Sequence, residues 1–168
     1  MNARLFLALW PGVVSRNAAA AVQRAIEWPE NARPAAPAGL HVTVHFIGQV
    51  PVERVEPLAD ALAVPTGQYQ LKLEQIEVWR GGIAVLTPSK VPQSLVDLHG
   101  RLGQVLEREG ISLEERPYRP HVTLARRAEI RPDRLARPIV WRSSGYALVL
   151  SSGGAYTPIR RYGPESAA

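Results

Sequence analysis

The pattern of apolar and polar positions along the chain predicts seven strands. Some are continuous apolar runs, as in a buried strand, and others alternate apolar with polar positions. The strand predicted over residues 40–46 is expected to end at Gly48. The alternation over residues 69–78 slips near Gln75, and Gly81 and Gly82 are expected to join this strand to the next one, residues 83–86, as a hairpin. The predicted strands cover residues 5–10, 40–46, 69–78, 83–86, 121–125, 139–150 and 156–161.

Apolar residues at helical spacing predict three helices between these strands. They run from residues 15 to 26, 53 to 63 and 92 to 109. Ser15 is expected to cap the first, and Gly110 to follow the last as its C′ residue. Residues 27–39 are rich in Pro, Ala and Gly and predict a loop or irregular edge segment, and the last six residues are expected to fray. Strands that mostly pair as hairpins, with a few helices between them, indicate an α+β protein built on antiparallel sheets.

Composition narrows the class of protein. The 168 residues suit one domain, or two small lobes sharing a core, and 46% of them are hydrophobic. The chain has no cysteine, which excludes disulfides, thiolate zinc sites and cysteine nucleophiles and fits the cytoplasm. Its longest apolar run is too short to cross a membrane. A net charge of +5 and a pI near 10.1 favour an anionic partner, nucleic acid first, although a basic surface that binds nothing fits equally well.

One four-residue pattern occurs twice. Residues 41–44 read HVTV and residues 121–124 read HVTL, which places two of the four histidines and two of the five threonines in one pattern. An internal repeat explains this better than chance does. In a strand, residues i and i+2 face the same way, so each histidine shares a face with the threonine that follows it. Val42, Val44 and Phe46 are then expected to pack into the core.

Two imidazoles and two hydroxyls brought to one cleft would suit a phosphoryl group, because all four can donate hydrogen bonds and two titrate near neutral pH. The simpler reading is that histidine and threonine only decorate half-exposed strands, and two matched copies make that reading the weaker one. A metal site is the other rival, since His41 and His45 are four residues apart. On a strand they would lie roughly 13 Å apart, so we expect no metal site.

Three segments resemble the 2H phosphoesterase superfamily, and within it the bacterial and archaeal RNA 2′,3′-cyclic phosphodiesterases, formerly called 2′-5′ RNA ligases. Residues 4–9 (RLFLAL) look like the opening strand of that family. Residues 40–48 (LHVTVHFIG) and 116–126 (RPYRPHVTLAR) look like its two motif strands. The likeness touches nearly the whole chain, is specific at both motifs, and weakens after Arg126 to a loose match over residues 151–162.

The resemblance implies one domain over residues 1–168, made of two intertwined lobes related by a pseudo-twofold axis. Antiparallel sheets would line a central cleft, with helices outside and with no metal or organic cofactor. The implied activity opens an RNA 2′,3′-cyclic phosphate to a 2′-phosphomonoester. His41 would be the proton donor to the leaving 3′ oxygen and His121 the proton acceptor that activates water, while Thr43 and Thr123 would hold phosphate oxygens.

Arg126 closes the second motif and would add a charge-assisted contact to the phosphate. Simple alternation puts it on the face opposite His121, so this role requires the strand to end or twist there. Phe6 and Tyr156 are candidates for stacking on a base. His45 could line the cleft but is more simply an exposed or core-edge histidine, and His99 and the four tryptophans are interpreted as structural.

The expected partner is RNA ending in a 2′,3′-cyclic phosphate, bound by a cytoplasmic monomer that has no membrane contact. Within enzymes, the alternative is a phosphodiesterase or ligase that acts on 2′-5′ linkages or on small cyclic nucleotides. From another class, the chain could bind RNA ends without turning them over. The paired His and Thr residues argue against that reading, because binding alone does not require two titratable groups.

Overall fold

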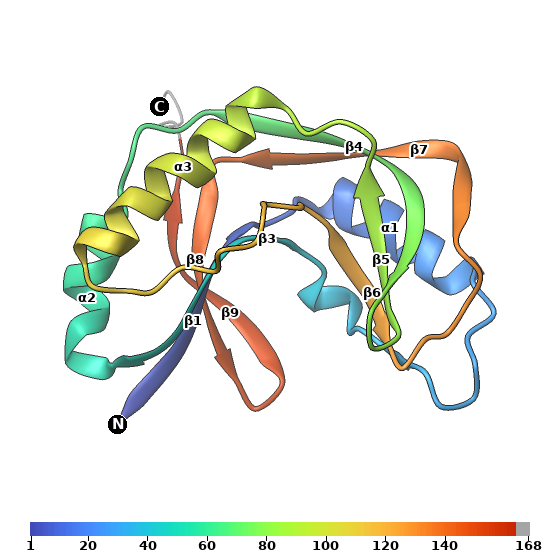
Figure 1. Cartoon of the computed structure of the whole chain (residues 1–168), viewed down its shortest axis with the longest axis horizontal. Coiled ribbons are helices and arrows are strands. Elements are labelled where there is room, and N and C mark those ends of the chain that lie inside the picture. The colour runs from blue at the N-terminus through green and yellow to red at the C-terminus, as the bar shows by residue number, and fades with distance from the viewer. Residues whose placement is uncertain (164–168) are drawn as a thin grey trace.

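The structure is a computed structural model that describes residues 1–163 (Figure 1). The strands are β1 (Asn2–Leu9), β2 (Arg33–Pro34), β3 (Val42–Pro51), β4 (Gln68–Trp79), β5 (Ile83–Pro88), β6 (Val122–Arg126), β7 (Asp133–Ser144), β8 (Tyr146–Ser152) and β9 (Ala155–Tyr162). The helices are α1 (Val13–Ala25), the short 3₁₀ turn η1 (Pro37–Gly39), α2 (Val52–Ala61) and α3 (Gln93–Arg108). Every predicted strand and helix overlaps an observed one. The expected fraying falls almost entirely on residues 164–168, outside the described part.

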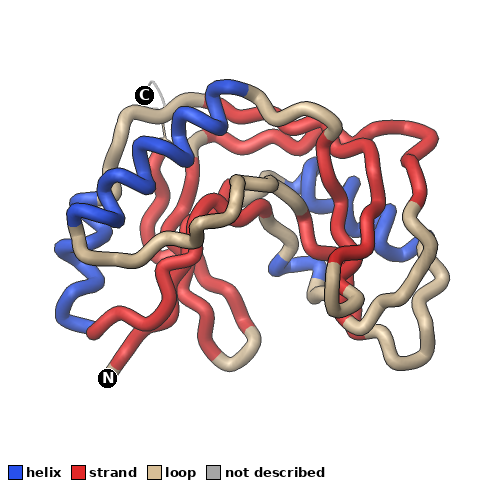
Figure 2. Tube along the Cα trace, viewed as in Figure 1, coloured by secondary structure: helices blue, strands red, loops and turns tan. Residues whose placement is uncertain are grey.

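The strands form one antiparallel sheet in the order β7-β4-β5-β6-β3-β1-β8-β9. The short strand β2 pairs in addition with the end of β6, at Ala125 and Arg126. In the middle of the sheet, β3 and β6 pair at one position, Val42 with Val122. We call β3-β1-β8-β9 the first lobe and β6-β5-β4-β7 the second lobe. Figure 2 shows the strands of both lobes in red, meeting near the middle of the molecule. The predicted α+β, bilobal, antiparallel fold class is confirmed.

The helices interleave the two lobes along the chain. Helices α2 and α3 contact β3 of the first lobe, and α2 also contacts β1, whereas α1 contacts β7 of the second lobe. Figure 1 shows α2 and α3 together at one end of the molecule and α1 near β4, β5 and β7 at the other. Because α1 follows β1 and α3 follows β5 in the chain, each lobe is covered by a helix that comes directly after a strand of the other.

The largest core cluster fills the space between the sheet and these helices. Helix α3 buries the side chains that its spacing predicted, and both motif strands bury their alternate residues against the same core. These buried side chains are Leu95, Leu98, Leu102, Val105, Leu106, Val42, Val44, Val122 and Leu124.

The predicted start of the first helix is wrong. Helix α1 begins at Val13 with Gly12 at its N-cap position, so Ser15 lies inside the first turn. The Ser15 side chain is buried, and its hydroxyl accepts a hydrogen bond from the backbone N–H of Arg142 in β7 at 2.9 Å. The hydroxyl therefore joins the helix to the sheet and does not cap the helix.

Two glycines place strand boundaries differently from the predictions. Gly48 does not end β3: it has a φ of 87° at an irregularity opposite Leu5, and the strand continues to Pro51. Gly145, with a φ of 71°, divides the predicted strand 139–150 into β7 and β8. A Cβ at Gly145 would overlap the carbonyl oxygen of Tyr162, so only glycine fits this sharp change of direction. The slip predicted near Gln75 is confirmed as a register shift.

Candidate active site

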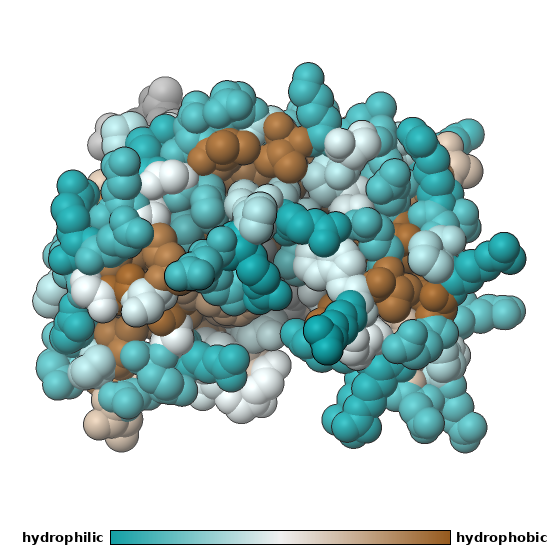
Figure 3. All heavy atoms as spheres, viewed as in Figure 1, coloured by the Kyte–Doolittle hydropathy of each residue, from teal (hydrophilic) through white to brown (hydrophobic). Residues whose placement is uncertain are grey.

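The two motifs lie side by side where the lobes meet. Continuing the antiparallel register one residue either way from the central β3–β6 pair places each motif histidine opposite the threonine of the other motif. All four side chains are half-buried on one face, while the residues between them are buried on the other. This face carries His41, Thr43, His121 and Thr123. Figure 3 shows the surface indented at its lower edge between the two lobes.

Each motif histidine is held by an equivalent hydrogen bond to the backbone. Nδ1 of His41 donates to the carbonyl oxygen of Gly39 at 2.7 Å, and Nδ1 of His121 donates to that of Arg119 at 2.8 Å. In each case the acceptor lies two residues earlier, so Nε2 is the nitrogen left for a ligand. Nε2 of His41 also lies 3.0 Å from Thr43 Oγ1.

Both imidazoles have lowered pKa values. Burial lowers the pKa of His41 most, and the nearby His121 lowers it further. Burial also lowers the pKa of His121, with added effects from the positive charges of Arg119 and Arg126. Near pH 7 both rings are therefore mainly neutral in the free protein, and a bound phosphate would raise both pKa values and favour the protonated form.

A bulge occurs at the same place in both motif strands. Val44 in β3 has no paired residue in β1, and Leu124 in β6 has none in β5. An extra residue reverses which face the following side chains occupy. Arg126 is therefore on the His121 face, is exposed, and lies close enough to lower the pKa of His121. This is the change of direction that its predicted role required.

The bulge in β3 corrects the expectation for Phe46 and agrees with the core-edge reading of His45. Phe46 was expected in the core but is 57% exposed. It lies five residues after the motif histidine, as Arg126 does in the other motif, so the two positions are equivalent. His45, considered as a possible cleft residue, is only 8% exposed: its ring stacks on His99 at 4.0 Å, and its Nε2 donates to the His99 carbonyl oxygen at 2.8 Å. His45 belongs to the packing between β3 and α3.

Aromatic rings surround His41. Phe6 lies 4.8 Å and Tyr156 5.3 Å from the imidazole, measured between ring centroids, and Trp10 stacks at 6.0 Å. Phe6 is 4% exposed, so it supports the other rings from below, whereas Tyr156 is 40% exposed and presents its ring to solvent. Of the two rings predicted to stack on a base, Tyr156 is therefore the accessible one.

His121 is flanked by one aromatic ring, Trp79, with charged groups beside it. Trp79 packs against its ring at 4.3 Å, and the Arg119 guanidinium lies over Trp79 at 4.6 Å and within 3.5 Å of a Glu77 oxygen. Trp10 and Trp79 were interpreted as core or edge residues, and both are half-buried, each beside a motif histidine. No local spacing relates either tryptophan to its histidine, because the two residues of each pair lie far apart in the sequence.

A cavity of about 270 Å³ lies in the second lobe, lined in part by Thr87, Arg119 and Pro120. Val85 pairs with Thr123, so Thr87, two residues further along β5, is on the same face and level with His121. Thr87 is 4% exposed, and its hydroxyl has no hydrogen-bond partner within the described residues. The cavity therefore lies next to His121 on the β5 side of β6, although none of the four motif side chains lines it.

Residues 1–163 hold no group of three or more histidine, cysteine, aspartate or glutamate side chains placed to bind a metal ion. Over the same residues, no helix is long and apolar enough to cross a membrane.

Comparison with known proteins gives the family. The sequence model of the 2′-5′ RNA ligase superfamily matches residues 14–145, which include both motifs. The chain belongs to the 2′-5′ RNA ligase superfamily.

Individual relatives agree with this assignment. An RNA 2′,3′-cyclic phosphodiesterase of Escherichia coli (strain K12) is 34% identical over 103 residues, covering 60% of this chain and 58% of that relative. The crystal structure of E. coli LigT complexed with 3′-AMP superposes with a TM-score of 0.88 at 25% identity, covering 99% of this chain and all of that one. A crystal structure described as a phosphoesterase has a TM-score of 0.86 at 28% identity, covering 97% and 98%.

Proposed function

We propose that this protein hydrolyses RNA 2′,3′-cyclic phosphates to 2′-phosphomonoesters, with His41 and His121 as its acid and base. The observation that carries the proposal is the matched presentation of two imidazoles. Each holds Nδ1 on a backbone carbonyl, so Nε2 is the ring nitrogen that can serve the substrate, and Nε2 of His41 lies 3.0 Å from the Thr43 hydroxyl on the same face. Its similarity to an RNA 2′,3′-cyclic phosphodiesterase and to LigT supports the same chemistry.

The proposed reaction is one in-line displacement. Nε2 of neutral His121 takes a proton from water as the water oxygen attacks phosphorus. The bond from phosphorus to the 3′ oxygen breaks on the opposite side, and protonated His41 gives its Nε2 proton to that oxygen. The 2′ oxygen keeps its bond to phosphorus, so the product is a 2′-phosphomonoester. One proton is taken up and one released, and each proton-transfer group contributes about 10²–10⁴-fold in rate.

The non-bridging phosphate oxygens need hydrogen-bond donors and positive charge. Thr43 and Thr123 each offer a hydroxyl on the histidine face, and Arg126 brings a guanidinium to the same face. Donors placed before the reaction stabilise the charge that develops at the transition state.

In-line geometry also orients the nucleoside. The leaving 3′ oxygen must lie beside His41, and the ribose that carries it follows on that side. This is where Tyr156 and Phe46 expose aromatic rings on which a base can stack. The charged half around His121 is left for the entering water.

A turnover assay tests this function. The wild-type protein, incubated with an oligonucleotide ending in a 2′,3′-cyclic phosphate in the presence of EDTA, is expected to give only the 2′-phosphomonoester, at the rate seen without EDTA. The metal independence is expected because two histidines supply both proton transfers. Liquid chromatography with 2′- and 3′-phosphate standards measures which product forms and how fast it forms. A 3′-phosphate product, or loss of activity restored by one specific metal ion, would contradict the proposal.

The same assay distinguishes the remaining alternatives. Turnover of small cyclic nucleotides with an unchanged oligonucleotide would favour the small-substrate activity, and binding without turnover would favour a non-catalytic RNA-end binder. The protein is proposed to act as a monomer, which light scattering would test. It is proposed to act in the cytoplasm, which the absence of cysteine supports.

A second candidate function, formation of a 2′-5′ linkage, is favoured by the cavity beyond His121. Hydrolysis requires space for only one water molecule, whereas this cavity, with a volume of about 270 Å³, has room for a larger group. Its volume and polar lining suit part of a nucleoside whose 5′-hydroxyl takes the place of water, and the Thr87 hydroxyl, buried at its edge without a partner among the described residues, is the donor that we expect this nucleoside to engage.

We therefore expect Thr87→Val to lower the ratio of 2′-5′-linked product to hydrolysis product at least threefold when an RNA with a free 5′-hydroxyl is supplied. The reason is the loss of one hydrogen bond to the entering nucleoside. Hydrolysis alone should change by less than twofold. Chromatography of both products measures the ratio, and methanol serves as a control nucleophile that is too small to need the cavity. An unchanged ratio would show that the cavity does not bind the entering group.

A further inference from the structure

Residues 109–121 connect α3 to β6 without forming a helix or strand. Within this connection, the side chain of Tyr118 turns back to the first motif. Its hydroxyl donates a hydrogen bond to the carbonyl oxygen of Thr43 at 2.9 Å, across 75 positions of the chain. The acceptor is the backbone of β3 two residues after His41, so the bond fixes the strand that carries the first motif.

Arg119, the residue after Tyr118, contacts the histidine of the second motif. The carbonyl oxygen of Arg119 accepts the hydrogen bond from Nδ1 of His121. A short path therefore joins the two histidines: from His41 along β3 to Thr43, through the Tyr118 hydroxyl, and through the Arg119 carbonyl to His121.

Few other ties join the two motif strands to each other. Strands β3 and β6 pair with each other only at Val42 and Val122. One paired position fixes the two motif strands relative to each other at a single level, whereas a second fixed point limits how the strands can turn about it. The Tyr118 hydrogen bond supplies such a point beside the paired position.

The Tyr118 ring is itself held in place. It stacks on His99 of α3 at 4.1 Å with an angle of 16° between the planes, and His99 stacks in turn on His45. Burial lowers the pKa of His99 to about 4, so this ring is neutral near pH 7. Burial also raises the pKa of Tyr118 well above its usual value, so its hydroxyl keeps the proton that it donates.

We propose that Tyr118 is a positioning residue that sets the relative placement of His41 and His121 through its hydrogen bond to the Thr43 carbonyl. The inference rests on the proposed two-histidine function, because placement matters only if both rings act on one substrate. Tyr118 touches no reacting atom. A displacement of about 1 Å between acid and base can cost on the order of 10²-fold in rate, so one hydroxyl can have a large effect.

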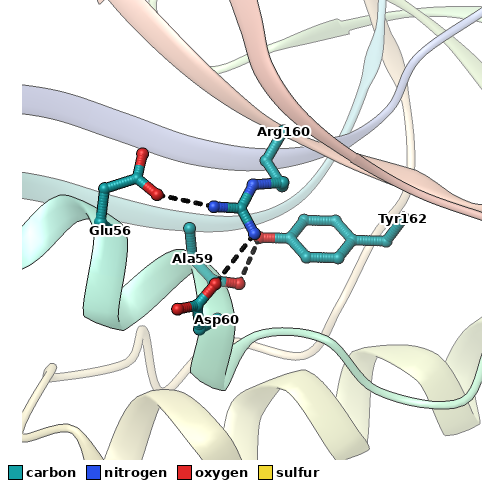
Figure 4. A network of polar contacts seen from close by, with 5 residues as sticks. All are labelled: Glu56, Ala59, Asp60, Arg160 and Tyr162. Atoms are coloured by element: carbon teal, nitrogen blue, oxygen red, sulfur yellow. Dashed lines mark hydrogen bonds and ion pairs between the residues drawn. The ribbon is translucent and has the colours of Figure 1, made fainter.

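Replacing Tyr118 by phenylalanine removes the hydroxyl and keeps the ring stack. The matched control is Tyr162→Phe, because the Tyr162 hydroxyl donates a similar bond to the Ala59 carbonyl oxygen at 2.7 Å. Figure 4 shows this bond between β9 and α2, beside the contacts of Arg160 with Glu56 and Asp60. The control therefore costs a tyrosine hydrogen bond that does not touch either motif.

Steady-state kinetics and imidazole ¹⁵N NMR shifts are measured for the wild type and both variants. Tyr118→Phe is expected to lower kcat about 10- to 100-fold with KM within threefold. It should also shift the His41 and His121 resonances. Tyr162→Phe should change neither property, even if both variants lose similar thermal stability.

An unchanged kcat in Tyr118→Phe, or an equal loss in both variants, would overturn the inference. So would unchanged imidazole shifts in Tyr118→Phe. A wild type without turnover would contradict the proposed function instead, and the shifts would still test whether Tyr118 positions the histidines.

Discussion

Replacing His41 or His121 by alanine is expected to lower kcat/KM by about 10²–10⁴-fold, because each variant loses one proton-transfer group. Both side chains are half-buried on the shared face and leave the core intact, so the fold should persist. Circular dichroism and thermal melting would confirm this, and turnover of the cyclic-phosphate oligonucleotide gives the rate.

Threonine variants are the matched comparison for these histidine variants. Thr43→Ala and Thr123→Ala each remove one hydrogen bond to phosphate, so we expect smaller losses, about 10- to 100-fold. Near-normal activity in either histidine variant would rule out the two-histidine mechanism.

Replacing Arg126 by methionine is expected to lower kcat/KM by about 10²–10³-fold, the loss typical of removing one donor that stabilises transition-state charge. A second effect has a defined sign. Arg126 helps to lower the pKa of His121, so its removal should raise that pKa and move the acid limb of the kcat/KM profile to higher pH. Arg24→Met is the control, because Arg24 is exposed in the last turn of α1 and loses the same charge. Equal losses in the two variants would mean that Arg126 acts only through net charge.

The sequence predicted the histidine face well because its signal was local. The spacing of His41 and Thr43 within a strand is enough to place both on one side, and the repeat at residues 121–124 then supplies the second pair. The helix over residues 92–109 could be predicted equally well, because the leucines that it buries are spaced along one helical face.

What the sequence could not predict comes from the backbone beyond each motif. A bulge at Val44 or Leu124 has no signature in residue type, yet it moves Phe46 out of the core and Arg126 onto the histidine face. The stack of His45 on His99 joins a strand to a helix 54 positions away, and local periodicity carries no information about such contacts.

The pH dependence of kcat/KM tests the central claim, that two imidazoles act as acid and base, most directly. Activity should be lost at low pH as the base, His121, gains a proton, and at high pH as the acid, His41, loses one. Because both pKa values are lowered in the free protein, the maximum should lie below about pH 6.5, the unperturbed imidazole value.

The two constants from that profile belong to the coupled pair. The kcat profile should lie at higher pH, since bound phosphate favours protonated imidazole. A bell-shaped kcat/KM profile with its maximum on the acid side is the predicted result. A profile flat from pH 5 to 9, with chemistry verified as rate-limiting, would contradict acid–base catalysis by His41 and His121.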